Sequence, residues 1–171
     1  GFYRGLCWYR KTFHLPDEAI GCKVFLEFGA AFSLADVWVN ERHAGQYMGG
    51  YTGFSVDASD YVKAGDNLIA IRLDNSHHPD ILPGITEADM DYTLYGGLYR
   101  EASLVVKDRL YIGRNGLTVT TPQVNADSAT MEVRMNVVND TDSDEVCQCI
   151  ATLRDPSGRV AATLEASACV L

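Results

Sequence analysis

Thr130-Met-Glu-Val-Arg-Met-Asn-Val-Val138 shows the cleanest alternation of apolar and polar side chains in this chain, and this alternation decides the fold class. Successive side chains of a β-strand point to opposite faces, so a period of two predicts a strand with one buried face. The same period recurs at residues 24–28, 34–40 and 67–73. No stretch has the helical spacing of apolar residues at i, i+3, i+4 and i+7. Short strands joined by Gly, Pro, Asn and Asp turns predict an all-β sandwich or jelly roll.

Each of these strands has one face that should lie in the core. The residues expected there are Val24, Leu26 and Phe28; Ala35, Val37 and Val39; Ile69, Ile71 and Leu73; and Met131, Val133, Met135 and Val137.

The charge balance narrows the classes of partner. The 171 residues include 14 basic and 23 acidic side chains, for a net charge of −9 at pH 7. Nucleic acids and anionic membrane surfaces attract clustered Lys and Arg, so neither is expected as a partner. No apolar run approaches the roughly 20 residues that span a bilayer. With 47% hydrophobic residues a packed core is expected, and a neutral ligand such as a sugar fits the charge.

A domain boundary is predicted near Gly113-Arg-Asn-Gly116, because the composition changes there. Tyr111 is the last aromatic residue of the chain. Beyond it, strand-like runs recur at 117–121, 130–138, 146–153 and 160–170. The sequence therefore predicts two domains, residues 1–112 and 113–171.

The clearest candidate for a binding site is Asp91-Tyr-Thr-Leu-Tyr-Gly-Gly-Leu-Tyr-Arg100. It closes a long polar segment that starts at Asp74, and it leads into the apolar run 102–106. Loops longer than about 12–15 residues in compact domains are usually functional or disordered. Tyrosine rings can stack on the C–H face of a sugar, and a carboxylate accepts hydrogen bonds from sugar hydroxyls. The alternative is a strand entry with core tyrosines and a solvated or loop-capping Asp91.

Two polar clusters invite other functions. Glu87, Asp89 and Asp91 have a spacing that could mimic the carboxylate pair of a glycosidase. His77-His78-Pro79-Asp80 invites a metal site, but adjacent histidines diverge in extended chain, and Pro79 favours that conformation for His78. Neither a self-contained catalytic pair nor a metal site is expected.

Isolated residues offer weaker candidates. Trp8 and Trp38 could stack on sugars, although packing is the more ordinary role for a tryptophan in a strand. Asn139-Asp-Thr141 fits an N-glycosylation acceptor, which matters only in a eukaryotic secretory route. The five cysteines are an odd number, so they cannot all pair internally. Cys147 and Cys149 fall on one strand face, which predicts buried free thiols.

Several motifs, taken in order, carry a resemblance to a known family. They are Trp8-Tyr-Arg-Lys-Thr-Phe13 with Leu15-Pro16, Leu26-Glu-Phe-Gly-Ala-Ala-Phe-Ser-Leu-Ala-Asp-Val-Trp-Val-Asn40, Gly49-Gly-Tyr-Thr-Gly-Phe54, Asn67-Leu-Ile-Ala-Ile-Arg72, Asp74-Asn-Ser-His-His-Pro79 and the decapeptide from Asp91. Over residues 1 to about 112 the chain resembles the sugar-binding domain of glycoside hydrolase family 2, which includes β-galactosidases, β-glucuronidases and β-mannosidases.

The resemblance implies a specific all-β architecture. Residues 1–112 would form a galactose-binding-like jelly-roll sandwich, and residues 113–171 a partial immunoglobulin-like β-sandwich. A complete sandwich of the second kind needs about 100 residues and 7 strands, so a truncated domain is expected. An early strand before the Trp8 motif is also expected to be missing.

The resemblance implies a function as well. The chain would be the non-catalytic N-terminal portion of a retaining exo-β-glycosidase, most readily a β-galactosidase. Both catalytic glutamates of the family lie on a downstream barrel, so no catalytic residue is expected in this chain. Asp91 matches the aspartate that reaches from this domain into the barrel and binds substrate. The alternative is a free-standing carbohydrate-binding or adhesion module.

Partners and location follow from the same resemblance. A β-glycoside carbohydrate and the protein's own catalytic barrel are the expected partners, and a homo-oligomer is allowed. No cofactor and no metal ligand is expected in this chain, although the intact enzyme could use sodium or magnesium. The cellular location is left open, with a periplasmic or secreted one favoured.

Overall fold

The computed structural model describes residues 3–84, 86, 88 and 90–170. These residues form mainly strands and loops, with a short 3₁₀ helix, η1 (Asp17–Ala19). The chain divides into two compact units, Gly1–Lys107 and Asp108–Leu171. The prediction of an all-β fold is therefore confirmed. Within the described part, no helix has the length and apolar character needed to cross a membrane.

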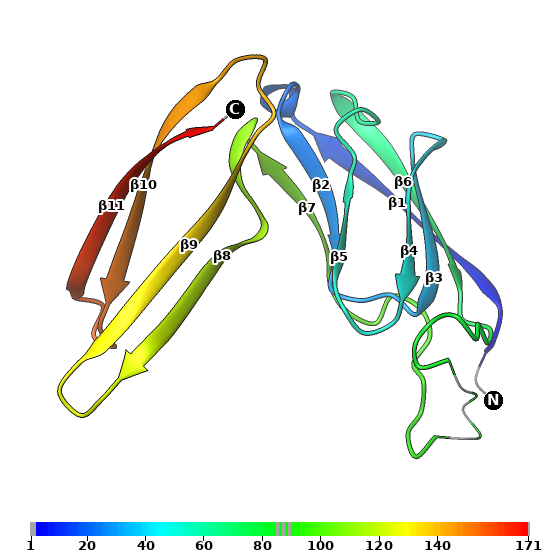
Figure 1. Cartoon of the computed structure of the whole chain (residues 1–171). Helices are drawn as coiled ribbons and strands as arrows, with labels where there is room; N and C mark the ends of the chain where they lie inside the picture. Colours follow the sequence, from blue (N-terminus) through cyan, green and yellow to red (C-terminus); the bar gives the residue numbers. More distant parts are fainter. Residues whose placement is uncertain (1–2, 85, 87, 89, 171) are drawn as a thin grey trace. The chain divides into compact units, whose positions relative to one another are not determined.

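The first unit is a jelly-roll sandwich of two antiparallel sheets (Figure 1). The larger sheet has the order β1-β6-β3-β4, and the smaller sheet has the order β5-β2-β7. The larger sheet contains β1 (Leu6–Leu15), β6 (Gly65–Asp74), β3 (Ser33–Val39) and β4 (Arg42–Gly49). The smaller sheet contains β5 (Phe54–Asp57), β2 (Lys23–Phe28) and β7 (Ala102–Lys107). Apart from β3 and β4, which a hairpin joins, neighbours in each sheet are not consecutive in sequence, as crossover connections of a jelly roll require.

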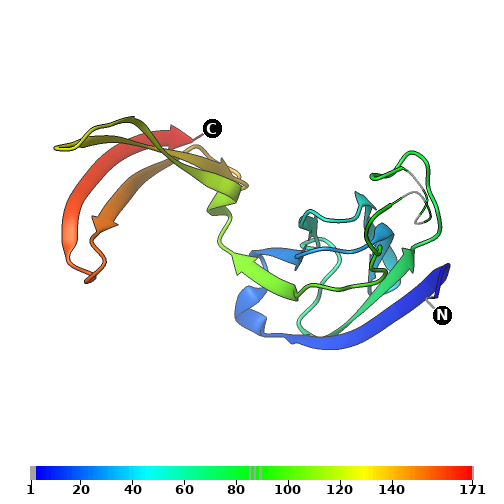
Figure 2. The ribbon, with the colours of Figure 1, turned by 90° about the horizontal axis from the view of Figure 1, so that it is seen from below.

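The core of this unit lies between the facing sides of the two sheets. Val24, Val37 and Leu73 are completely buried there. All the side chains predicted to face inward from residues 24–28 and 34–40 are buried, and Ile69 packs against the same core. Since each strand alternates, the polar partners of these residues fall on the outer faces. Figure 2 shows the two sheets from the end at which the loop between β6 and β7 lies.

A tight turn joins β3 to β4 on the larger sheet. Asn40 and Glu41 have φ angles of 48° and 69°, as expected of a type I′ hairpin turn. The Asn40 side chain donates to the carbonyl of Tyr61 at 2.9 Å and accepts from the backbone of Leu68 at 3.0 Å. The turn is thus anchored on its Asn40 side, while Glu41 occupies a left-handed position in which glycine would be unstrained.

The second unit consists of two antiparallel hairpins, each a long curved ribbon (Figure 2). Its strands are β8 (Leu110–Val124), β9 (Ala129–Asn139), β10 (Glu145–Arg154) and β11 (Val160–Val170). Met131, Val133 and Met135 are half-buried while Glu132 and Arg134 are exposed, so the predicted alternation is confirmed. The immunoglobulin-like assignment of this unit remains a prediction.

Gly113-Arg-Asn-Gly116 lies inside β8. Ile112 pairs with Val137 and Leu117 with Met135, so this run forms a bulge in β8. Gly116 is required there, because a Cβ would lie 2.7 Å from the carbonyl oxygen of Gly113. The two compact units instead divide between Lys107 and Asp108.

Candidate functional site

The loop between β6 and β7 is held to the sandwich at its start by Asn75. This side chain is 8% exposed. Its Oδ1 accepts a hydrogen bond from the backbone of Gly5 at 2.7 Å, and its Nδ2 donates to the carbonyl of Tyr3 at 3.0 Å. The Asn75 backbone also donates to the carbonyl of Gly5 at 3.3 Å. The first residue of the loop is therefore fixed against the segment that leads into β1.

The paired glycines fix the other end of the loop. Phe32 and Gly97 exchange two backbone hydrogen bonds, of 3.1 and 3.3 Å. A Cβ on Gly96 would lie 2.0 Å from Asn75 Nδ2, and a Cβ on Gly97 would lie 2.5 Å from the Tyr9 hydroxyl. Gly97 also has a φ of 87°, which glycine adopts at little cost. The glycines of the decapeptide therefore serve close packing of backbone against neighbouring side chains.

A tyrosine cluster extends from this anchored end. The Tyr99 hydroxyl donates a hydrogen bond to the carbonyl of Gly50. The ring centroids of Phe32 and Tyr51 lie 5.8 Å apart in a T-shaped arrangement. Burial, together with Tyr92 and Tyr99, raises the pKa of Tyr51, and part of the effect is a hydrogen bond with Tyr92. Tyr51 is 40% exposed and Tyr92 55% exposed, so both rings border solvent.

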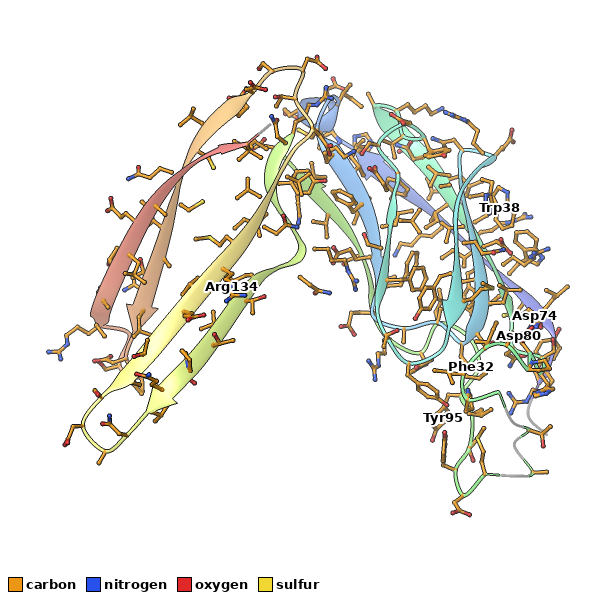
Figure 3. The ribbon with its side chains drawn as sticks, in the orientation of Figure 1. Phe32, Trp38, Asp74, Asp80, Tyr95 and Arg134 are labelled. Atoms are coloured by element: carbon orange, nitrogen blue, oxygen red, sulfur yellow. The ribbon has the colours of Figure 1, made fainter. Side chains whose placement is uncertain are left out.

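Tyr51 is the member of this cluster that the sequence did not single out as a binding residue. It lies in the Gly49–Phe54 motif, about forty positions from Asp91. The pairing of Phe32 with Gly97 and the hydrogen bond from Tyr99 to Gly50 bring the two segments to the same end of the sandwich. Figure 3 shows Phe32 and Tyr95 at this end. The signal that could have found Tyr51 was an aromatic flanked by glycines in a turn.

Asp91 is exposed on the loop. Among the described residues its carboxylate has no hydrogen bond and no ion pair. The loop-capping role considered for Asp91 therefore has no partner in that part of the chain. Glu87 and Asp89, which the sequence groups with Asp91, lie outside the described residues.

Of the two histidines, His78 contacts a carboxylate. His78 Nε2 lies 3.5 Å from Asp74 Oδ2. Burial opposes ionisation of Asp74, but hydrogen bonds from Ser76 and the nearby His78 outweigh it and lower the pKa of Asp74. Across the described part of the chain, no three His, Cys, Asp or Glu side chains gather in a way that could hold a metal ion.

Hollows flank the base of the loop. One of about 360 Å³ is lined by Tyr9, Asn75 and Tyr95, among others. Another of about 200 Å³ reaches Phe32 and His78. Enclosed ligand pockets typically have volumes of about 300–1,000 Å³ and bury roughly 70–90% of the ligand. The first hollow is at the low end of this range, and the second is below it. The chain by itself thus offers an open, partial surface for a ligand.

The remaining candidates have structural partners. Asn139 donates its amide to the carbonyls of Ser143 and Val170, at 2.8 and 3.1 Å, which makes it a poor glycosylation acceptor. Cys147 and Cys149 are free thiols, as predicted, but half-buried. They lack complete burial because they lie on a strand of a two-stranded sheet.

The tryptophans do not pack in the core. Trp8 and Trp38 contact each other with ring centroids 5.3 Å apart, on the outer face of the larger sheet. Trp8 is 53% exposed. The packing expected for these residues is therefore limited to the contact between the two rings and to the contacts of Trp38 with His43 and Arg72. Figure 3 shows Trp38 well away from Phe32 and Tyr95.

Comparisons with known proteins agree with this fold and loop. The sequence model described as "Glycosyl hydrolases family 2, sugar binding domain" matches residues 2–108. A β-galactosidase of Thermoanaerobacter pseudethanolicus is 39% identical over 113 residues, which cover 64% of this chain and 15% of that relative. A β-glucuronidase of Bacteroides fragilis is 35% identical over 112 residues, which cover 65% of this chain and 16% of that relative.

Solved structures give the same result over almost the whole chain. A glycosyl hydrolase family 2 member from Bacteroides cellulosilyticus matches with a TM-score of 0.87 at 30% identity, covering 98% of this chain and 22% of that one. Bacteroides uniformis β-glucuronidase 2, solved covalently bound to cyclophellitol-6-carboxylate aziridine, matches with a TM-score of 0.89 at 29% identity, covering 98% and 20%.

The fold and the matched residues define a jelly-roll sugar-binding domain of a glycosidase. The chain belongs to glycoside hydrolase family 2. It spans only 15–16% of the length of the two curated relatives described above.

Proposed function

We propose that this chain is the sugar-recognition part of a β-glycosidase, and that Asp91 accepts hydrogen bonds from hydroxyls of the terminal sugar. The observation that carries the proposal is an exposed carboxylate, without a partner among the described residues, on a loop anchored at both ends, by Asn75 and by Gly97. Binding a sugar to such a carboxylate costs little free energy, because no hydrogen bond to a described residue has to break first. A loop fixed by the sandwich also holds the group in place before the sugar arrives.

The reaction we propose for the intact protein is hydrolysis of a terminal β-glycoside, with a β-galactoside as the substrate. Its support is the family and the β-galactosidase among the relatives. Both catalytic carboxylates would come from a barrel elsewhere in the protein. The loop would lend Asp91 to the sugar subsite of that barrel, since a neighbouring domain often completes a pocket. Tyr51, Tyr92 and Tyr95 would offer rings to the C–H faces of the substrate.

Further features of the intact protein remain part of this proposal. The second unit would be an immunoglobulin-like sandwich, which its antiparallel hairpins support. The proposal also allows the intact protein to form a homo-oligomer. Sodium or magnesium would be held elsewhere in the intact enzyme, and no step proposed for this chain involves an ion.

Replacing Asp91 by asparagine tests the proposal. This substitution keeps the size of the side chain but removes the charge and turns one oxygen into a donor. In the intact enzyme we expect kcat/KM on a β-galactoside to fall at least about tenfold, which corresponds to about 1.4 kcal/mol of lost transition-state stabilisation. The melting temperature should move little, because an exposed carboxylate without partners contributes little to stability.

The matched control is Asp17→Asn, which changes another exposed aspartate of the same unit outside the loop. Its kinetics should equal those of the wild type. Unchanged kinetics in Asp91→Asn, with a clear fall in melting temperature, would show that Asp91 serves the fold and would overturn the proposal.

The isolated 171-residue chain gives a second test. We expect it to release no product from chromogenic β-galactoside, β-glucuronide or β-mannoside substrates above the buffer rate, because both catalytic glutamates are proposed to lie outside it. Turnover that disappears on Glu87→Gln or Asp91→Asn would place the catalytic carboxylates in this loop and contradict the assignment.

A further inference from the structure

A groove crosses the outer face of the larger sheet, away from the loop. It has a volume of about 320 Å³ and is lined by Trp8, Arg10, Trp38, Glu41, Leu68 and Ala70. Strand pairing explains its shape. Ala70 of β6 pairs with Arg10 of β1 on one side and with Trp38 of β3 on the other. The small alanine therefore forms the floor, and the larger side chains form the walls.

The aromatic wall of the groove is open to solvent. Trp8 is 53% exposed, and its ring is tilted by 37° against that of Trp38. A tryptophan in a strand normally buries most of its large apolar surface, since this is the main stabilisation it can provide. Trp8 leaves about half of that surface in water at a concave position. An exposed aromatic lining a groove is a typical site for a partner with apolar faces.

Trp38 is held rigidly by a polar network beneath it. The Arg72 guanidinium lies 5.9 Å from the Trp38 ring centroid. The ring centroids of His43 and Trp38 lie 5.1 Å apart in a T-shaped arrangement. Both residues are tied to Asp36, which is 4% exposed: Arg72 Nη2 lies 2.6 Å and His43 Nε2 lies 3.2 Å from its carboxylate oxygens. Gln46 donates to the same carboxylate at 2.8 Å. A fixed ring loses little entropy when a ligand binds.

Two charged side chains lie at the rim of the groove. Arg10 and Glu41 are exposed, and neither has a hydrogen bond or ion pair among the described residues. Glu41 also has a φ of 69° in a turn whose second position favours glycine. A glutamate there carries a conformational cost that glycine would avoid. A role for its carboxylate at the groove explains why the cost is tolerated.

We propose that this groove is a second saccharide site, which binds a pyranose ring of an oligosaccharide chain by stacking on Trp8. Sugars with equatorial hydroxyls have an apolar C–H face and a polar rim, and the groove matches both. The Trp8 and Trp38 rings meet the apolar face, while Glu41 accepts from ring hydroxyls and Arg10 donates to them. A packed protein surface would instead have to supply partners for both charges or bury them unpaired, which is costly. This site does not depend on the role proposed for Asp91.

Intrinsic tryptophan fluorescence is a specific probe of the groove, because the chain has 2 tryptophans and both line it. We expect titration with a β-1,4-linked glucose tetramer to change the emission saturably, with a Kd in the millimolar range. Trp8→Ala should weaken binding at least about tenfold, with Trp38 left as the reporter.

Glu41→Gly separates a binding role from a structural one. Removal of the carboxylate should weaken binding of the tetramer about threefold or more. The same substitution should raise the melting temperature, because glycine adopts the positive φ without strain. Asp91→Asn should leave the fluorescence titration unchanged, so failure at one site is distinguishable from failure at the other.

Acrylamide quenching of the intact protein completes the test. In the intact protein, the part of the quenching that is lost in Trp8→Ala reports on Trp8. That part should be present before sugar is added, and the tetramer should reduce it. The proposal is overturned if the emission shows no saturable change with the tetramer, or if the Kd of the tetramer is the same in Trp8→Ala and Glu41→Gly as in the wild type. It is also overturned if the intact protein shields Trp8 from acrylamide before any sugar is added, since another protein surface would then occupy the groove.

Discussion

Arg72→Ala is expected to lower the free energy of unfolding of the jelly roll by about 2–3 kcal/mol. Arg72 makes two hydrogen bonds to one oxygen of Asp36, at 2.6 Å from Nη2 and 3.2 Å from Nε. The Asp36 side chain is 5% exposed and that of Arg72 is 39% exposed. Removal of the guanidinium leaves a buried carboxylate with only Gln46 and His43 as partners. Because Arg72 is partly solvated, the loss is smaller than for a fully buried pair.

The expected pH dependence identifies the cause. Burial opposes ionisation of Asp36, but hydrogen bonds from Gln46, Arg72 and His43 outweigh it and lower the pKa of Asp36. A carboxyl group whose pKa is lowered by folding contributes stability above its unfolded pKa of about 3.9, and this contribution is lost as the pH falls through the folded value. The difference in the free energy of unfolding between wild type and Arg72→Ala should therefore be largest near neutral pH and should decrease as the pH falls into the acid range.

Urea unfolding at several pH values measures this effect. Arg10→Ala is the matched control, since Arg10 lies on the same sheet face without a partner among the described residues. It should change stability by less than about 0.5 kcal/mol. An equal loss in both variants, or a loss in Arg72→Ala that is independent of pH, would show that side-chain packing and not the Asp36 network is responsible.

Asn75→Ala is expected to cost about 3 kcal/mol and to loosen the loop that carries Asp91. The substitution removes the acceptor for the backbone of Gly5 and the donor for the carbonyl of Tyr3. It also opens a void beside Gly96, whose backbone packs against this side chain. Backbone groups left without partners in a half-buried site account for most of the cost.

Hydrogen exchange reports on the loop and urea unfolding on the whole unit. In Asn75→Ala we expect faster exchange at Gly97 and Leu98 relative to the core strands. Asn75→Asp is a comparison variant that keeps the acceptor for Gly5 but places a carboxylate oxygen against the Tyr3 carbonyl, so it should also loosen the loop. Exchange at Gly97 that is unchanged in Asn75→Ala would mean that the pairing of Phe32 with Gly97 anchors the loop without Asn75.

The strand faces were predictable from the sequence because the period of two is a local property. Val37 and Leu73 alternate with Asp36 and Arg72, and the two apolar side chains are buried as the alternation predicts, whereas the burial of Asp36 on the other face does not follow from it. The partnership of Asp36 with Arg72 was not predictable, because it depends on the register of β3 against β6. The change of composition after Tyr111 predicts a boundary near Gly113–Gly116, but composition does not show that this run is a bulge inside a strand, because glycine and asparagine occur in bulges as well as in turns.

The candidate site shows the same division. Asp91 and its tyrosines were visible as a polar and aromatic end to a long loop. Tyr51 was not, because only the folded chain brings Gly49–Phe54 to that loop. The groove at Trp8 and Trp38 was visible only as two strand tryptophans, since the small floor at Ala70 and the strained position of Glu41 appear only once the strands are paired.

The most direct measurement of the role of Asp91 is a crystal structure of the intact protein with a sugar trapped in its active site. We expect an Asp91 carboxylate oxygen at hydrogen-bond distance from a hydroxyl of the terminal sugar, with the loop held by Asn75 and Gly97 as it is in the free chain. A sugar bound in the active site while Asp91 points into solvent, or is engaged only by protein groups, would contradict the proposed function.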